Sequence, residues 1–391
     1  MTKNRFISQI IVSGYLLVLL IALFMMMSRP DVVSSLISLS FFWLALVFVL
    51  TYKQLRQGKI ITFVCAVLCV INVYISVLTN VTIIGSSFNY YKKVIMFISA
   101  LLWMLICSNY TVDKRVVQYI TYINIVLSFL FFVFARNGTE FYEGEVLLSL
   151  NFSNPNQTGM FILNVILYLL CSIPLLARAK FNKVLIPLFV LYNLALVYLL
   201  YRTGSRASLS AIVFFLFCLL ADGFLKKHKA FRKGLCLIWS LFPLLFCIYY
   251  VFVIGGNFGF DTSLGIEGHG KFSDTRMMIW RPAFDSFNNS VLVGDYYGIS
   301  GGTGISQLHN THLDVLVSYG ITPFILFVFL LFFQTYRLFE KAPSIVNRMG
   351  IYAFMACFIS GVFEASLVSG SAGLYILSFG FLLFARSNSA L

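Results

Sequence analysis

The stretch that decides the architecture of this chain runs from residue 273 to residue 320 and reads SDTRMMIWRPAFDSFNNSVLVGDYYGISGGTGISQLHNTHLDVLVSYG. It concentrates charged and polar side chains in a sequence that is otherwise mostly apolar. It holds two of the four histidines, His309 and His312, together with Arg276, Arg281 and Asp285. We therefore expect the chemistry of the protein here, and we interpret the remainder as a scaffold that fixes this stretch at a membrane surface.

The composition indicates that this scaffold is embedded in a membrane. Hydrophobic residues make up 60% of the 391 residues and charged residues only 11%, whereas soluble domains carry about 25% charged residues. Apolar runs of about 20 residues, long enough to cross a bilayer, recur along the chain. The prediction is an all-α, polytopic integral membrane protein with about twelve transmembrane helices in one domain, residues 1–391. The predicted helices span residues 7–27, 32–51, 60–78, 94–109, 116–135, 157–176, 184–201, 206–225, 235–254, 317–336, 348–365 and 369–385.

The basic residues predict the orientation. The net charge of +14 is spread over short loops between apolar runs, which is the pattern of membrane topology and argues against a nucleic-acid partner. With the N-terminus in the cytoplasm, most Lys and Arg residues fall in inner loops, although Lys92 and Lys93 fall in an outer one. Most carboxylates and three of the four histidines also fall outside. We therefore predict a multi-pass protein of the cell (plasma or inner) membrane with both termini cytoplasmic.

One long, glycine-rich loop dominates the predicted outer face. It covers residues 255–308, between the ninth and tenth spans, and is expected to form part of the active site, because structured loops of this length are usually functional. Short helices are expected at residues 275–287 and 308–319, and the second would lead into the tenth span.

The residue pattern predicts no metal and no other cofactor. All eight cysteines lie within apolar runs and are interpreted as small core residues. The histidines have no zinc-binding pattern around them. Glu140, Glu143 and Glu145, in a second outer loop, could bind a hard cation, but such a run more often forms a solvated loop, which we favour.

The first candidate motif is YRTGSRAS at residues 201–208, between the seventh and eighth spans. If the eighth helix begins near Thr203, Arg202 and Arg206 flank its first turn, where free backbone N–H groups and the positive end of the helix dipole attract phosphate. Guanidinium adds paired donors for phosphate oxygens. We predict phosphate binding by Arg206, whereas anchoring at lipid headgroups explains Arg202 equally well.

Two further motifs supply another arginine and a base. Arg276 precedes an aromatic, apolar helix face, so this helix is expected to lie on the membrane with Trp280 at headgroup level and Arg276 directed at a phosphate. Arg281 is better explained by snorkelling or pairing. Histidine is the commonest general base, and His309 is the predicted one. His312, three residues on, could equally pack the helix start.

In their order, these motifs resemble those of a known family. TGSR at 203–206, DTRMMIW at 274–280, VGDYYG at 293–298 and HNTHLDVLVSYGI at 309–321 occur in the order and spacing typical of the O-antigen polymerase and O-antigen ligase superfamily. NPN at 154–156, which opens the sixth span, resembles that family as well. The resemblance covers roughly residues 150–330.

The resemblance implies an inverting, metal-independent glycosyltransferase that acts on undecaprenyl-diphosphate-linked glycans. In that family, loop arginines bind the diphosphate and the histidine of the HN motif activates the acceptor. Carried over to this chain, the catalytic roles fall on Arg206, Arg276 and His309. Further substrate-binding candidates are Arg202, Arg281, His312 and Asn156.

The leading functional prediction is a polymerase that joins lipid-linked repeat units of a capsule, exopolysaccharide or O-antigen at the outer face. Its expected partners are the undecaprenyl-diphosphate-linked oligosaccharide and membrane lipids, with a flippase and a chain-length regulator as candidates. A ligase that moves finished glycan to another acceptor fits the same motifs. A polyprenyl-phosphate sugar transferase with Asp31 as its base is a further alternative. A flippase or transporter would instead place charged residues at mid-span, where the predicted helices have none.

Overall fold

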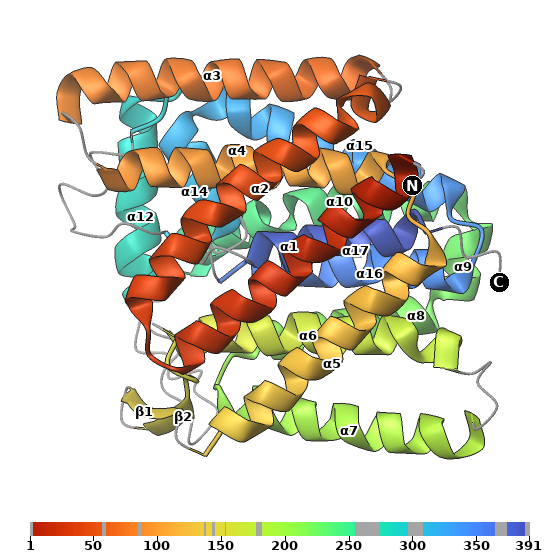
Figure 1. The fold of residues 1–391 in the computed structure, drawn as a ribbon. Coiled ribbons are helices and arrows are strands. Elements are labelled where there is room, and N and C mark those ends of the chain that lie inside the picture. The colour runs from red at the N-terminus through yellow and green to blue at the C-terminus, as the bar shows by residue number, and fades with distance from the viewer. Residues whose placement is uncertain are drawn as a thin grey trace.

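A computed structural model describes residues 3–56, 60–84, 88–136, 138–142, 145–152, 154–176, 182–254, 274–295, 308–363 and 374–387 of the chain. These residues form a bundle of helices with one two-stranded hairpin (Figure 1). Six of the described helices are long and apolar enough to cross a membrane, and six shorter apolar helices accompany them. The expected all-α, apolar architecture is therefore confirmed for the described part of the chain.

The helices, in chain order, are α1 (Lys3–Met26), α2 (Pro30–Arg56), α3 (Ile60–Ile84), α4 (Phe88–Asn109), α5 (Lys114–Phe134), α6 (Pro155–Leu176), α7 (Asn182–Arg202), α8 (Arg206–Leu220), α9 (Asp222–Lys227), α10 (Lys229–Ile248), the π-helix η1 (Tyr249–Ile254), α12 (Asp274–Asn289), α14 (Thr311–Tyr319), α15 (Ile321–Lys341), α16 (Ile345–Ser360) and α17 (Leu374–Ala385). The strands are β1 (Thr139–Tyr142) and β2 (Glu145–Leu148).

Most observed helices lie within a few residues of their predicted ranges, and both short helices expected around the long loop are present as α12 and α14. The tenth predicted span was placed too early. It begins at Ile321 because Gly320, with a backbone φ of +86°, separates it from α14. The eighth predicted span is divided at Ala221 into α8 and the short α9. Residues 361–363 of the eleventh predicted span form a turn instead of helix.

The centre of the bundle is formed by α16 and α17. Every side chain of α17 and nearly every side chain of α16 is buried, as expected for helices that are apolar on all faces. α16 packs against α17, α8 and α6, and α17 packs also against α4. In Figure 1, α3 and α7 lie at opposite edges of the bundle.

All four tryptophans of the chain join two segments through the indole N–H. The bonds to backbone carbonyls are Trp43 to Ile10 (2.8 Å), Trp103 to Ile376 (3.1 Å), Trp239 to Met355 (2.8 Å) and Trp280 to Leu308 (2.8 Å). In an apolar environment an indole N–H without a partner is costly. Each tryptophan therefore fixes a particular pair of neighbouring segments as well as filling space.

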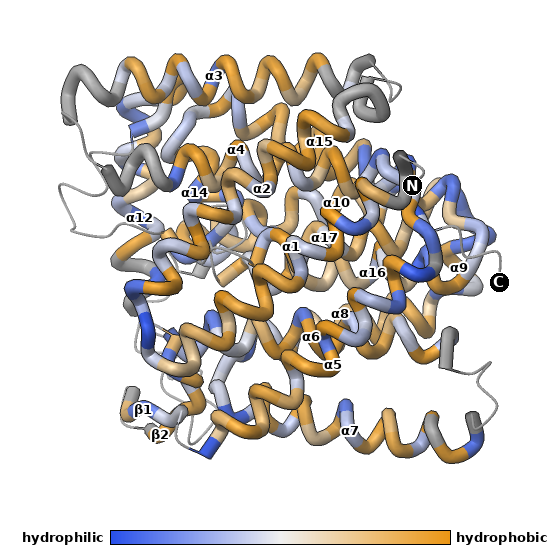
Figure 2. Tube along the Cα trace, viewed as in Figure 1, coloured by the Kyte–Doolittle hydropathy of each residue, from blue (hydrophilic) through white to orange (hydrophobic). Residues whose placement is uncertain are grey.

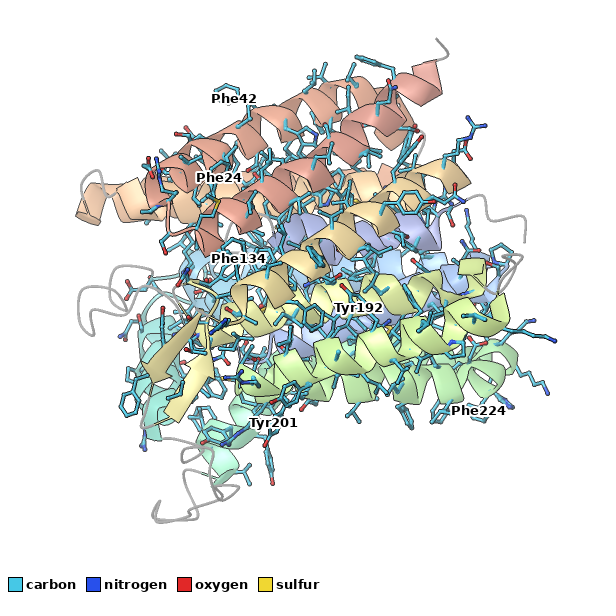
Figure 3. The ribbon with its side chains drawn as sticks, turned by 60° about the horizontal axis from the view of Figure 1, so that its bottom comes forward. Phe24, Phe42, Phe134, Tyr192, Tyr201 and Phe224 are labelled. Atoms are coloured by element: carbon cyan, nitrogen blue, oxygen red, sulfur yellow. The ribbon has the colours of Figure 1, made fainter. Side chains whose placement is uncertain are left out.

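The surface of the bundle suits a lipid environment. Hydrophobic residues cover the helices along most of their length, as the orange tube in Figure 2 shows. Phe42, Tyr201 and Phe224 lie at the periphery (Figure 3), with 75%, 51% and 47% of their surface exposed. Large apolar side chains are exposed on α2, α3, α5 and α7 as well, a pattern that water would penalise and hydrocarbon would accept.

The two ends of the bundle differ. α12, α14 and the β-hairpin lie at one end, which we call the loop end, and α9, the start of α1 and the end of α17 lie at the opposite end, which we call the terminal end (Figure 1). Of the predicted long loop 255–308, the structure describes residues 274–295 and Leu308; the remainder of that prediction lies outside the described residues.

Candidate functional site

Two of the predicted site motifs meet on the turn that follows α16, residues 361–363, which we call the junction turn. Nη2 of Arg276, on α12, lies 3.1 Å from the carbonyl oxygen of Phe363 and donates to it. Nδ2 of Asn310, just before α14, donates to the carbonyl oxygen of Val362 at 3.0 Å. The fold thus brings the DTR motif and the HN motif to the same short segment at the loop end.

Asn310 fixes the start of α14. Its Oδ1 accepts hydrogen bonds from the backbone N–H groups of His312 (3.1 Å) and Leu313 (2.9 Å), which is the N-cap arrangement. Its Nδ2 also donates to the carbonyl oxygen of Pro243, on α10, at 2.9 Å. Because Asn310 is fully buried, these bonds hold α14 in a defined place between α10 and the junction turn.

His309, the predicted base, immediately precedes this cap. Its backbone φ is +50°, a left-handed conformation that few non-glycine residues adopt. On one side, the carbonyl of Leu308 accepts the indole N–H of Trp280; on the other, the backbone N–H of Thr311 donates to the carbonyl of Gly361 at 2.9 Å. The half-buried His309 is therefore held beside the turn that Arg276 also contacts.

His312 lies in the interior. It has no exposed surface, and its Nε2 is 2.7 Å from the carbonyl oxygen of Ser240 on α10, so Nε2 carries the proton. Burial lowers the pKa of His312 to about 4, which keeps the ring neutral. The rings of Phe324 and Phe327 pack edge-on against it. In this structure His312 joins α14 to α10, and substrate contact would require it to become exposed.

An aromatic cluster attaches α12 to the rest of the loop end. Trp280 has no exposed surface, and its ring packs against those of Phe246, Tyr250 and Phe363, with centroids 5.5 to 6.5 Å away. Trp280, expected on a helix face in contact with lipid headgroups, instead lies inside the protein, where the carbonyl of Leu308 accepts its N–H. Arg281, the next residue, is exposed.

The second group of predicted residues lies around the turn between α7 and α8. α7 ends at Arg202 and α8 begins at Arg206, where the predicted span 206–225 begins, and not near Thr203, the start on which the phosphate-binding argument was conditioned. Gly204, with φ +68°, ends α7 in the left-handed conformation. Arg206 is thus the first residue of α8, where a cation opposes the helix dipole and an anion is favoured.

Asn156 belongs to the neighbouring element. α6 begins at Pro155, and Oδ1 of Asn154 accepts the backbone N–H of Asn156 at 2.8 Å. One turn further along, a side chain at Gly159 would place its Cβ 2.5 Å from Cβ of Ser205. α6 therefore packs closely against the α7–α8 turn, and the NPN and TGSR motifs are brought together as neighbours.

The EFYEGE run was predicted to be a loop, but it forms the β1–β2 hairpin. Thr139 pairs with Leu148 in antiparallel register, and Leu148 is fully buried. A Cβ at Gly204 would lie 3.3 Å from the side chain of Leu147, so the hairpin covers the α7–α8 turn. Glu140 is exposed on β1; Glu143 and the side chain of Glu145 lie outside the described residues.

Both groups of candidate residues lie at the loop end, and α16 connects them. This helix packs against α6 and α8, and its C-terminal end leads into the junction turn. Sequence reasoning missed this turn, because the groups that bond to Arg276 and Asn310 are the backbone carbonyls of Phe363 and Val362. Every residue type has such a carbonyl, so the sequence cannot indicate it.

Sequence reasoning also missed a buried ion pair. Lys93 was predicted in an outer loop, but it lies in the second turn of α4. Its Nζ is 2.6 Å from Oδ1 of Asp314 and 3.0 Å from Oγ of Ser318, both on α14. The side chains of Lys93 and Asp314 are 7% and 1% exposed. The position of Lys93 directly before a long apolar run was the one signal available for finding it.

No protein-family model matches the chain, and no curated protein matches it. The functional argument rests on the motifs and on the geometry described above.

Proposed function

We propose that the protein is a membrane-embedded glycosyltransferase that polymerises undecaprenyl-diphosphate-linked repeat units, in the manner of the O-antigen polymerase and ligase superfamily. In this proposal the twelve apolar helices all span a cell membrane, both termini are cytoplasmic, and the loop end faces outward. The abundance of lysine at the terminal end, where α9 and α10 expose Lys226, Lys227, Lys229 and Lys233, supports this orientation.

The observation that carries the proposal is the convergence of Arg276 and the His309–Asn310 turn on the junction turn. A cationic donor on this turn, and a histidine directly before the residue that bonds to it, lie at the end of an apolar bundle. They suit a substrate with a diphosphate at the membrane surface and a hydrocarbon tail within it. Arginine forms charge-assisted and often bidentate hydrogen bonds with phosphate, and these are stronger than hydrogen bonds between neutral groups.

The proposed reaction follows from these groups. His309 accepts the proton of an acceptor sugar hydroxyl as its oxygen bonds to the anomeric carbon of the donor glycan. The bond between that carbon and the diphosphate oxygen breaks, and undecaprenyl diphosphate leaves. Arg276 and Arg206 stabilise the negative charge that develops on the leaving diphosphate. Attack from the face opposite the leaving group inverts the anomeric configuration.

The placement of Arg206 supports its role as a second diphosphate ligand. It opens α8, where its charge and the helix dipole both favour an anion. Arg202 ends α7 on the other side of the same turn, and Asn156 opens the adjoining α6. These three residues are proposed to form one side of the substrate site, opposite the side formed by Arg276 and His309. Arg281 is exposed on α12, the helix that carries Arg276.

One observation favours the transporter alternative. Buried charges within a helix bundle often mark translocation pathways, and Lys93 and Asp314 are such charges. Lys93 nevertheless lies in the second turn of α4, near the loop end and away from mid-span, and its charge is neutralised by Asp314. We therefore place glycosyl transfer first.

The proposal is tested with the purified protein in nanodiscs, a chelator, and an undecaprenyl-diphosphate-linked oligosaccharide as the probe. A glycan ladder on a gel supports polymerisation. Addition of a single glycan to a separate acceptor would assign the ligase reaction. Transfer of the intact lipid-linked probe across a vesicle bilayer, without any new glycosidic bond, would overturn the proposal in favour of transport.

A further inference from the structure

The helix that carries the HN motif is held on two opposite faces. α14 has nine residues, all of them buried. His312 bonds to α10 through the carbonyl of Ser240. Asp314, two residues later and therefore about 200° around the helix, bonds to Lys93 of α4. Ser318, one turn beyond Asp314, receives a second bond from the same ammonium group. Together these contacts fix the rotation of α14 about its own axis.

The buried ion pair has a large free-energy cost of desolvation. Removing a carboxylate and an ammonium from water is strongly unfavourable, and replacing such pairs by apolar residues is often neutral or stabilising. Packing alone therefore does not explain why α4 and α14 meet through Lys93 and Asp314. Directional bonds explain it, because an apolar contact would let a short helix rotate or slide.

Rotation of α14 would displace His309. The histidine sits at the N-terminal tip of this helix, separated from it only by the cap residue Asn310. The junction turn, to which Asn310 bonds, is also the anchor of Arg276. We infer that Lys93 and Asp314 are positioning residues that set the orientation of α14 and thereby the place of His309 in the reaction centre. The activity measurement described next depends on the proposed function, whereas the labelling measurement after it does not.

The decisive variant is the neutral pair Lys93→Met with Asp314→Leu. It removes both charges, so the bundle is expected to keep its apparent melting temperature. If the pair positions His309, turnover in the ladder assay should fall by about 100-fold, the loss that a displacement of about 1 Å at a reaction centre can cause. The loss should be in kcat, with KM for the lipid-linked donor little changed. The matched control is Arg348→Met with Asp222→Leu, which removes the ion pair between α16 and α9 at the terminal end.

A second measurement does not depend on activity. A His309→Cys variant is labelled with a membrane-impermeant maleimide in a Cys65→Ser background, because Cys65 is the half-buried one among the eight cysteines and the others are buried. Adding the neutral pair should change the labelling rate by roughly threefold or more, and adding the control pair should not. If wild-type protein forms no product, the proposed function fails, and the labelling rates alone decide the inference.

A neutral pair that folds with wild-type turnover and an unchanged labelling rate would overturn the inference and leave the ion pair as a packing contact. If the neutral pair fails to fold, Lys93→Arg replaces it. That variant keeps the charge but substitutes a planar, longer donor, and the inference predicts about a tenfold lower turnover in a folded protein. Wild-type turnover and labelling in Lys93→Arg would contradict it.

Discussion

The side-chain amide of Asn310 forms four hydrogen bonds. Its oxygen accepts two backbone N–H groups, and its nitrogen donates to the carbonyls of Pro243 and Val362. This uses both donors of the amide and both acceptor positions. Aspartate could cap the helix equally well but would oppose two carbonyl oxygens, so asparagine is the residue that this position requires.

We predict that Asn310→Ala lowers the unfolding free energy by about 2–5 kcal/mol, because the helix cap is lost and two buried carbonyls lose their donor. Thermal unfolding in detergent checks this, with the exposed Asn288→Ala on α12 as the control. Equal melting temperatures for the two variants would show that the described bonds do not hold α14.

Because His312 is buried, we predict that the unfolding free energy depends on pH. Its pKa falls from the ordinary 6.5 to about 4 on folding, so at pH values between these the unfolded chain binds a proton that the folded chain does not. The unfolding free energy should therefore decrease as the pH is lowered through this window, by up to about 3 kcal/mol in total. His312→Gln, which keeps a donor for the carbonyl of Ser240, should flatten this dependence between about pH 7 and about pH 5. The exposed His228→Gln should not, and an equally steep dependence in His312→Gln would refute the assignment.

At the scale of elements, the segment 293–295 after α12 and Gly320, the glycine between α14 and α15, depend on each other for space. A Cβ at Gly294 (φ +76°) would lie 2.6 Å from the carbonyl oxygen of Val317, and one at Gly320 (φ +86°) would lie 2.2 Å from that of Leu292. Real side chains do not come so close to backbone atoms, and both glycines also have a left-handed backbone. The segment after α12 is thus locked against the end of α14, as the bond from the N–H of Asp295 to Val317 (2.8 Å) confirms.

We predict that Gly320→Ala sharply reduces the yield and melting temperature of folded protein, because the backbone of Leu292 would have to move. Gly234→Ala is the matched control: Gly234 lies within α10 with open space around it, and alanine there should be neutral or stabilising by roughly 0.5–1 kcal/mol. Similar behaviour of the two variants would show that the close approach at Gly320 does not exist.

Hydropathy predicted most elements, because a helix in lipid must be apolar over about 20 residues. It failed where tertiary contacts decide. The charged residues at 140–145 predict a loop and hide the burial of Leu148 in the β1–β2 hairpin. The short helix was predicted to end at residue 319, but the tenth span was predicted to begin at 317, before Gly320, because the apolar run continues through that glycine.

For the site, the sequence pointed to Arg276 and His309. The fold bonds Arg276 to the junction turn, and it bonds Asn310, the residue after His309, to the same turn. It could not reveal the carbonyls of that turn or the partner of Asp314. Lys93 comes from a helix more than two hundred residues away in sequence, and a single sequence contains no sign of such a pairing. Whether these residues act in catalysis stays a prediction.

At the scale of the whole molecule, the proposal requires the loop end and the terminal end to face opposite sides of a membrane. Asp285 on α12 and His228 before α10 are both exposed and lie at the loop end and the terminal end respectively. Asp285→Cys should react with an impermeant maleimide in intact cells, and His228→Cys only after the membrane is opened. Labelling of both residues from the same side would contradict the twelve-span topology.

The central claim is that His309 and Arg276 together transfer lipid-linked glycan. The most direct measurement compares the glycan ladder formed in nanodiscs by the wild-type protein, His309→Ala and Arg276→Ala, with the exposed His228→Ala and Arg115→Ala as controls. We predict a ladder from the wild type and both controls, and a loss of about 100-fold or more in turnover for His309→Ala and Arg276→Ala. A full-length ladder from a folded His309→Ala protein would contradict the account.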